Sequence, residues 1–244
     1  DAIDEVQVVV SPFDVRQSNF IGGGVNAITK SGTNTVRGTA YVYHQNGKLR
    51  GTYVDGDAVT QDRDEKETVY GATVSFPILK NKLFFFGSFE YTSNPTMPNY
   101  WRPSANGVAD KDAYISRTTV ADMQKVSDYL KNTYGYSTGG WSDYGKTESN
   151  LKLLGRIDWN ISQKHHLAFR YNYTTNSYWV GTNGSSADFN DPTGIKGTRM
   201  SYNRLSQYSM AFVNSMYSME NNVHSFSFDL NSRLGDNLSN QLLV

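Results

Sequence analysis

Alternation of apolar and polar residues is the dominant pattern of this chain. From residue 151 to residue 162 the odd positions are apolar or glycine, and the even positions are mainly polar or charged. A period of two residues predicts a β-strand with one apolar and one polar face. The alternation resumes from Leu167 to Thr174, so the polar residues from Ser162 to His165 predict a tight hairpin turn.

Two further hairpins follow from the same pattern. Residues 68–76 are predicted to pair with residues 83–92, and residues 205–219 with residues 223–234 across Glu220-Asn221-Asn222. A strand over residues 36–45 brings the total to about seven. The side chains expected on the apolar faces of these hairpins are Tyr70, Ala72, Val74, Phe76, Leu83, Phe85, Phe89, Tyr91, Phe226, Phe228 and Leu230.

The connections between these strands alternate between short and long. Turns near residues 80, 163 and 221 are short, whereas the segments at about 46–67, 94–148 and 178–204 are long. The second long segment contains a predicted helix from Thr119 to Tyr134, with Thr119 as N-cap and Gly135 as C-cap. A segment of that length predicts a structured loop rather than a simple connector.

Composition favours a membrane β-protein over a soluble enzyme. Aromatic residues make up 14% of the chain, yet the mean hydropathy is −0.56. The longest strongly apolar run, Leu83 to Phe86, is far shorter than the ~20 residues that a transmembrane helix needs. In a membrane barrel only every second residue faces lipid, so a polar chain can still cross a bilayer.

Charge and cysteine content argue against nucleic-acid binding and against disulfides or cysteine-bound metals. The 23 basic and 23 acidic residues balance, so no electrostatic attraction to nucleic acid is expected. The absence of cysteine excludes disulfides and cysteine-ligated metals. No Ser, His and Asp arrangement and no carboxylate pair indicates catalysis, so the chain is predicted not to be an enzyme and to need no cofactor or metal.

A glycine-rich segment precedes the first barrel-like strand. It reads Ile21-Gly-Gly-Gly-Val-Asn-Ala-Ile-Thr-Lys-Ser-Gly-Thr-Asn34, where Val25, Ala27 and Ile28 predict a short strand that ends at Ser31-Gly32. This segment resembles the end of the plug domain of TonB-dependent outer-membrane receptors. The flanking residues 4–14 and 31–34 are similar to the Oar-like and SusC-like branches of that family, which are common in Bacteroidota-type bacteria.

The resemblance implies the fold class and the domain organisation. Residues 1–35 would be the C-terminal part of a plug domain. Residues 36–244 would be the N-terminal portion of an antiparallel transmembrane β-barrel with extracellular loops at the three long segments. Because the family builds its barrels from about 22 strands, the chain is expected to be a fragment, all-β in class.

The function implied is energised import of an extracellular substrate through a plugged barrel in the bacterial outer membrane. Expected partners are membrane lipid, the remainder of the barrel and plug, a TonB-type energy-coupling protein and a surface lipoprotein lid. A non-transporting barrel that serves as a surface-binding or assembly subunit is the alternative. A soluble β-sandwich adhesin or carbohydrate-binding module is a third possibility.

Three groups of residues are candidates for this function. The plug-to-barrel junction is assigned to Gly22, Gly23, Gly24, Asn26, Thr29, Lys30 and Gly32. Contacts between plug and lumen wall are assigned to Lys152, Arg156, Asp158 and Arg170, which could equally line a wet lumen. Ligand contacts in the long loop are assigned to the flat aromatic side chains Tyr100, Trp101, Trp141 and Tyr144, which could instead form loop core or an interfacial girdle.

Other motifs carry less weight. Residues 22–27 fit a G-x-G-x-x-G/A dinucleotide fingerprint, but that loop must open a helix, and here a strand-like run follows. His165 and His166 are adjacent on a strand, so they point to opposite faces and cannot chelate one metal. The acidic residues from Asp55 to Glu65 do not have the spacing of an EF-hand, so a solvated loop is expected.

Overall fold

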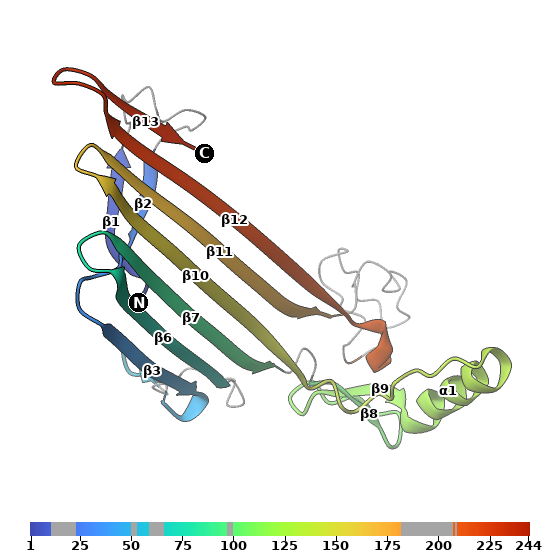
Figure 1. Ribbon diagram of the computed structural model, residues 1–244. Coiled ribbons are helices and arrows are strands. Elements are labelled where there is room, and N and C mark those ends of the chain that lie inside the picture. The colour runs from blue at the N-terminus through green and yellow to red at the C-terminus, as the bar shows by residue number, and fades with distance from the viewer. Residues whose placement is uncertain (11–22, 50–52, 59–65, 97–99, 182–206, 208) are drawn as a thin grey trace.

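The computed structural model describes residues 1–10, 23–49, 53–58, 66–96, 100–181, 207 and 209–244. Its main feature is one seven-stranded antiparallel sheet, called the wall below, in the order β13-β12-β11-β10-β7-β6-β3 (Figure 1). The strands that form it are β3 (Arg37–Asn46), β6 (Lys66–Leu79), β7 (Leu83–Thr96), β10 (Lys146–Ser162), β11 (His165–Val180), β12 (Tyr217–Arg233) and β13 (Ser239–Leu243). The wall is an open part of a barrel, which confirms the predicted all-β fold class.

Two hairpins of the wall match the alternating pattern. β6 pairs with β7 around residues 80–82, and β10 pairs with β11 around residues 163–164. Together with the connection between β12 and β13, these turns lie at one end of the wall, called the turn end. The described parts of the three long connections, residues 47–49, 53–58, 100–145 and 209–216, lie at the opposite end, called the loop end.

The predicted hairpin at Glu220-Asn221-Asn222 is wrong. β12 runs straight through these residues, and Asn221 pairs with Asn176 of β11. The partner stretch Thr174–Ser177 is equally polar, so the two segments pair with their polar residues in register, and polarity alone did not distinguish a strand from a turn. The true turn lies at residues 234–238, where Leu234 N–H donates to Leu238 O over 2.9 Å. The turn predicted near 221 therefore sits inside a strand.

The outer face of the wall carries a continuous apolar band. On β10 it extends from Leu151 to Ile161, and the register places Phe85, Phe89 and Phe169 on the same face. Ten residue steps of about 3.3 Å on a strand tilted by about 40° span about 25 Å, the height of the lipid-facing band of a barrel. Beyond Leu151 the next outer-face row is polar in all six strands that reach it: His44, Thr68, Ser93, Ser149, Ser177 and Glu220.

The inner face is polar and carries a cross-strand row of interacting side chains. Tyr41, Gly71, Glu90 and Lys152 are aligned on four neighbouring strands. The Tyr41 ring lies across Gly71, where any Cβ would overlap it, and its hydroxyl donates to Glu90 Oε2 over 2.9 Å. Glu90 Oε1 also accepts from Lys152 Nζ at 2.8 Å. The missing side chain at Gly71 is therefore what allows this row to form.

Replacing Gly71 by alanine is expected to lower the free energy of unfolding by about 1–3 kcal/mol, because the Cβ displaces a packed ring. Gly155→Ala is the matched control, since a Cβ there meets nothing within 4 Å among the described residues. Urea unfolding of the full-length protein in lipid vesicles measures both. Equal stabilities for the two variants would contradict the role given to Gly71.

The connection from β7 to β10 carries the helix α1 (Val120–Tyr134), which follows the parallel strands β8 (Arg102–Ser104) and β9 (Ile115–Thr119). The predicted caps are confirmed: Thr119 forms a capping box with Asp122, and Gly135 adopts a left-handed φ of 68°. No helix among the described residues is long and apolar enough to cross a membrane. The short strands β4 (Tyr53–Val54) and β5 (Asp57–Ala58) and the 3₁₀ turns η1 (Gly47–Leu49) and η3 (Val213–Ser215) complete the loop end.

The capping box predicts that α1 loosens in acid. The Thr119 hydroxyl donates to Asp122 Oδ2 over 2.6 Å, and this bond, followed by that from the Thr119 N–H, lowers the pKa of Asp122. A lowered pKa stabilises the folded helix above the pKa of the unfolded chain, and the effect is lost as pH falls through the folded pKa.

Thr119→Ala should cost the helix about 1 kcal/mol at neutral pH and remove most of this acid sensitivity. Hydrogen-exchange protection factors of residues 120–134, compared between pH 6 and pH 3, test both effects. A wild-type helix equally protected at the two pH values would rule out the contribution of Asp122.

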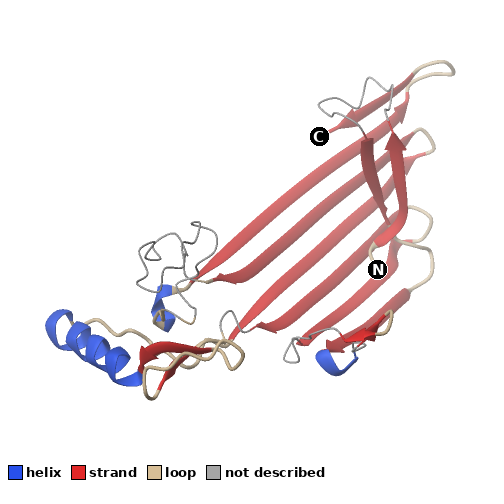
Figure 2. Cartoon of the chain, turned by 180° about the vertical axis from the view of Figure 1, so that it is seen from behind, coloured by secondary structure: helices blue, strands red, loops and turns tan. Residues whose placement is uncertain are grey.

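A separate hairpin lies against the inner face of the wall. β1 (Ile3–Val10) pairs with β2 (Gly23–Thr29), which confirms the short strand predicted at residues 25–28. The view from behind shows the hairpin crossing the wall near the turn end (Figure 2). From β2 the chain returns to the wall through residues 30–36 and enters β3.

Candidate functional site: the junction between hairpin and wall

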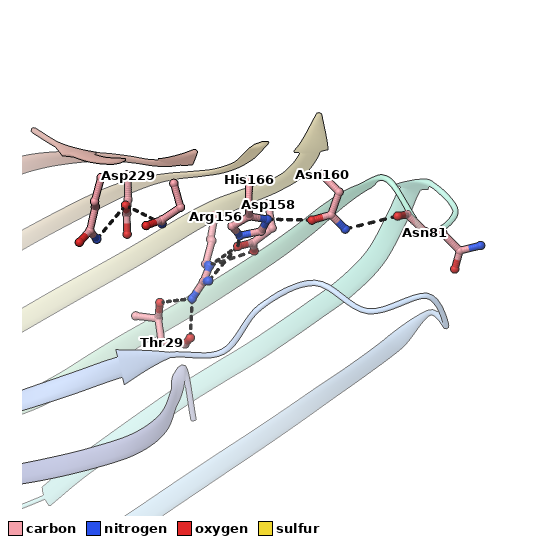
Figure 3. A network of polar contacts seen from close by, with 9 residues as sticks. Thr29, Asn81, Arg156, Asp158, Asn160, His166 and Asp229 are labelled. Carbon is pink, nitrogen blue, oxygen red and sulfur yellow. Dashed lines mark hydrogen bonds and ion pairs between the residues drawn. The ribbon is translucent and has the colours of Figure 1, made fainter. Parts of the chain in front are cut away.

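The end of β2 is held by an arginine of the wall. Arg156 Nη1 donates to Thr29 O over 2.7 Å and to Thr29 Oγ1 over 3.1 Å (Figure 3). Arg156 lies near the middle of β10 and belongs to the inner face. One side chain of the wall thus binds both the backbone and the side chain of the last strand residue of the hairpin.

Asp158 orients this arginine. The two residues are separated by one position on β10, so both side chains are on the inner face, and Asp158 accepts from Arg156 Nε at 2.9 Å and from Nη2 at 2.8 Å. The Arg156 and Asp158 side chains are only 12% and 6% exposed. The carboxylate of Asp158 compensates the charge of the Arg156 guanidinium, so neither group is a buried unpaired ion. The bidentate contact also leaves Nη1 of Arg156 free to donate to Thr29.

A chain of polar side chains connects the Arg156–Asp158 pair to the turn end. His166 Nδ1 lies 2.7 Å from Asn160 Oδ1, and its Nε2 lies 3.9 Å from Asp158 Oδ1. Asn160 Nδ2 donates to Asn81 O over 3.3 Å, in the turn between β6 and β7. The wall residues that contact Thr29 are therefore connected to that turn through side chains of β10 and β11 (Figure 3).

Asn81 completes the connection by binding Asn34. The Asn81 N–H donates to Asn34 Oδ1 over 2.7 Å, and Asn34 Nδ2 donates back to Asn81 Oδ1 over 2.8 Å. Asn81 has a φ of 63°, a left-handed conformation that asparagine tolerates better than most residues. Residues 29–34, called the junction strap below, are thus bound to the wall at both ends.

Gly32 allows the middle of the junction strap to lie close to the wall. A Cβ at this position would lie 2.5 Å from Phe84 Cβ and 2.7 Å from both the N and the O of Phe85. The strap therefore rests directly on the backbone of β7, which only glycine allows. Beside it, the Thr33 and Ser75 hydroxyls lie 3.2 Å apart.

The other predicted junction residues have smaller roles in the geometry. Gly23 and Gly24 open strand β2 opposite Val10 and Val9, Asn26 pairs with Gln7, and Gly22 lies outside the described residues. Lys30 Nζ forms an exposed ion pair with Asp1 at 3.2 Å. The junction function of this group stays a prediction.

The four predicted lumen residues all lie on the inner face, but only one of them contacts the hairpin in the described structure. Arg156 binds Thr29, and Asp158 binds Arg156. Lys152 instead pairs with Glu90. Arg170 lies opposite Arg156 in the register, and its buried Nε has no hydrogen-bond partner among the described residues.

Several contributors were missed from the sequence. Asn34, Asn81 and Asn160 gave no signal because asparagine is common in turns and at strand ends. Their pairing joins positions 47 and 79 residues apart in the chain. His165 and His166 do contact different partners, Ser232 and Asn160, as their opposite orientation predicts.

The predicted ligand-loop residues pack between two long connections. Tyr144 is 1% exposed, and its hydroxyl donates to Ala211 O over 2.6 Å. It forms a small core with Ala211, Val213 and Met216, against which Trp101 also packs. Ring contacts join Tyr100 and Trp101 to Tyr114, and Trp141 to Phe212. Trp101, Trp141 and Tyr144 thus join residues 100–145 to residues 209–216. A ligand role for all four residues stays a prediction.

Comparison with known proteins agrees with the sheet and its apolar band. The family model described as an outer membrane beta barrel domain matches residues 28–109. The TonB-dependent transporter Oar of Myxococcus xanthus is 27% identical over 185 residues, which is 72% of this chain and 16% of that protein. No solved structure matches.

The chain thus spans about a sixth of the length of that transporter. The match reaches well beyond the glycine-rich segment, since it covers most of the chain. The residues that the family model matches include β3, β6 and β7 of the wall. This chain is similar to TonB-dependent receptor-like β-barrel proteins, and it lies in the bacterial outer membrane.

Proposed function

We propose that this chain supplies the end of the plug and the first part of the barrel wall of a transporter that imports an extracellular substrate. In this arrangement residues 1–35 are plug, residues 36–244 are wall, the loop end is extracellular, and the turn end is periplasmic. The observation that carries the proposal is the clamp of Arg156 on Thr29. It supports a plug that is held in the lumen by contacts that can be released.

The chemistry of the clamp suits release. Hydrogen bonds from a charged donor contribute about 1.5–3 kcal/mol each, which is enough to hold the strand end at rest. Because Asp158 already neutralises Arg156, withdrawal of Thr29 leaves no isolated charge behind. A pull on the plug through a TonB-type protein would therefore meet a modest and reversible barrier at this point.

The remainder of the junction strap is built to stay in place. Gly32 lies on the β7 backbone, and Asn34 is paired twice with Asn81. Movement of the plug is accordingly expected to involve residues before Gly32, while Asn34 stays bound to the turn. The junction would then keep the plug attached to the wall during each transport event.

Arg156→Gln in the full-length protein tests this function. The variant keeps a hydrogen-bonding side chain but loses the fork that binds Asp158 and Thr29 together, so the plug should loosen. We expect a several-fold increase in channel conductance in planar bilayers and in the sensitivity of cells to large antibiotics. Heat-modifiable electrophoretic mobility checks that the barrel is folded.

Lys152→Gln is the matched control, because Lys152 lies on the same face of β10 and binds Glu90 rather than the hairpin. If Arg156→Gln and Lys152→Gln gave the same low conductance as the wild type, the proposed clamp would be refuted. A leak from both variants would show a general effect of lumen charge instead.

A non-transporting surface receptor is the second candidate. The observation in its favour is the packed core that Tyr144 forms between two long connections, because a rigid loop surface suits docking. Removing the energy-coupling protein from cells separates the two functions. Loss of substrate accumulation supports transport, whereas unchanged surface binding with no accumulation in any strain supports a receptor.

A further inference from the structure

The inner face carries a row of three asparagines nearer the loop end than the Arg156 clamp. Asn150, Asn176 and Asn221 are directly aligned on β10, β11 and β12. The register contains no irregularity between this row and Arg156, so all three side chains share the face that holds the plug hairpin. They are called the amide row below.

One atom of the amide row lacks a partner. Asn150 Oδ1 is buried and accepts no hydrogen bond from the described residues. A buried acceptor left unsatisfied costs about 1–3 kcal/mol, so a ligand that donates a hydrogen bond there recovers this free energy. Asn221, at the other end of the row, is exposed.

The charged side chains on either side of the row each have a partner. Toward the clamp, Lys152 and Glu90 form an ion pair at 2.8 Å. Toward the loop end, Glu148 accepts from the Trp179 N–H over 3.1 Å. On β12 the inner-face neighbours of Asn221 are Met219 and Val223, which are 40% and 56% exposed.

These features fit a ligand with amide groups and aliphatic side chains. Each carboxamide offers one acceptor and a pair of donors, which match the N–H and C=O of a peptide group. Strands about 4.8 Å apart place the three amides along about 10 Å, the length of about three extended residues. The exposed side chains of Met219 and Val223 suit contact with the aliphatic side chains of such a ligand.

We propose that the amide row binds an extended, uncharged segment of a polypeptide substrate entering from the loop end. The proposal rests on the transport function inferred above and adds to it the chemical class of the cargo. Binding to the row requires no energy input, so it is separable from plug release. Its failure and the failure of the transport proposal therefore give different results.

The test uses the full-length protein in detergent micelles and a fluorescently labelled ten-residue peptide of serine, threonine, alanine and valine. Fluorescence anisotropy should show saturable binding. The triple variant N150L/N176L/N221L, in which each side chain keeps its approximate size, should raise the Kd at least tenfold. Asn222→Leu is the matched control, because this residue is next to Asn221 but faces outward, where Tyr173 donates to it.

Three outcomes would overturn the proposal: no binding of the peptide by the wild-type protein, equal binding by the triple variant, or equal loss in the Asn222→Leu control. Maltoheptaose is the competing probe. If it displaces nothing, the polypeptide class is supported. If it binds in a way that depends on the amide row while the peptide does not, the cargo is a glycan and the proposal is wrong.

Discussion

A Gly32→Ala variant is expected to release the junction strap from the wall and leave the barrel of the full-length protein leaky. The new methyl carbon would lie 2.5 Å from Phe84 Cβ and 2.7 Å from two backbone atoms of Phe85. A side-chain rotation cannot relieve these contacts, because they involve the Cβ of Phe84 and backbone atoms of Phe85. The backbone cannot move aside easily either, since β7 is a central strand paired on both sides. The strap must therefore lift, and the reciprocal pair of Asn34 and Asn81 is expected to break with it.

The cost of such overpacking is about 1–3 kcal/mol, and the loss of two amide hydrogen bonds adds about 1–3 kcal/mol. Bilayer conductance and urea unfolding of the full-length protein measure the two consequences. Gly24→Ala is the matched control, since a Cβ there meets nothing within 4 Å among the described residues. A Gly32→Ala protein as tight and as stable as Gly24→Ala would show that the strap does not rest on the wall as described.

A Leu153→Lys variant is expected to destabilise the barrel in lipid. Leu153 belongs to the outer apolar band, level with Phe89 and Tyr173. A cation on the lipid face of a barrel costs about 2–4 kcal/mol at the bilayer midplane and less toward the interfaces. Leu153 lies between the bilayer midplane and the interface. We therefore expect the variant to lose about 2 kcal/mol of the free energy of unfolding from lipid vesicles.

Leu154→Lys is a stringent control for this effect. It makes the same substitution one residue along the same strand, on the inner face beside Ser88 and Asn172. There the ammonium group remains hydrated, so the expected loss is below about 1 kcal/mol. Equal losses for the two variants would reverse the assignment of the two faces.

The alternation of the sequence predicted those strands whose two faces differ strongly. On β10 the outer face is apolar and the inner face holds Lys152, Arg156 and Asp158, so the periodicity was unambiguous. On β12 the residues above the apolar band are polar on both faces, from Glu220 to Asn222, and the strand was mistaken for a turn. Period-two reasoning fails where neither face is buried in lipid.

The candidate site was predictable only in part for a related physical reason. Arg156 could be selected because a charged residue on the lumen face of a strand is conspicuous. Its target Thr29 and the pair of Asn34 with Asn81 depend on how the strap crosses two strands, which no local pattern encodes. The helix α1 was predicted with its caps because Thr119 and Gly135 are local signals at its two ends, and the structure adds the capping box with Asp122.

The network of the junction also limits how related transporters can be recombined. Residues 1–35 grafted onto a foreign barrel would bring Thr29 and Asn34 without Arg156 and Asn81, which lie beyond that boundary. Such a chimaera would carry a correctly folded hairpin on a wall that lacks the hydrogen-bond partners of Thr29 and Asn34. The segments to exchange together are therefore the β1–β2 hairpin, the junction strap and the hairpins β6–β7 and β10–β11.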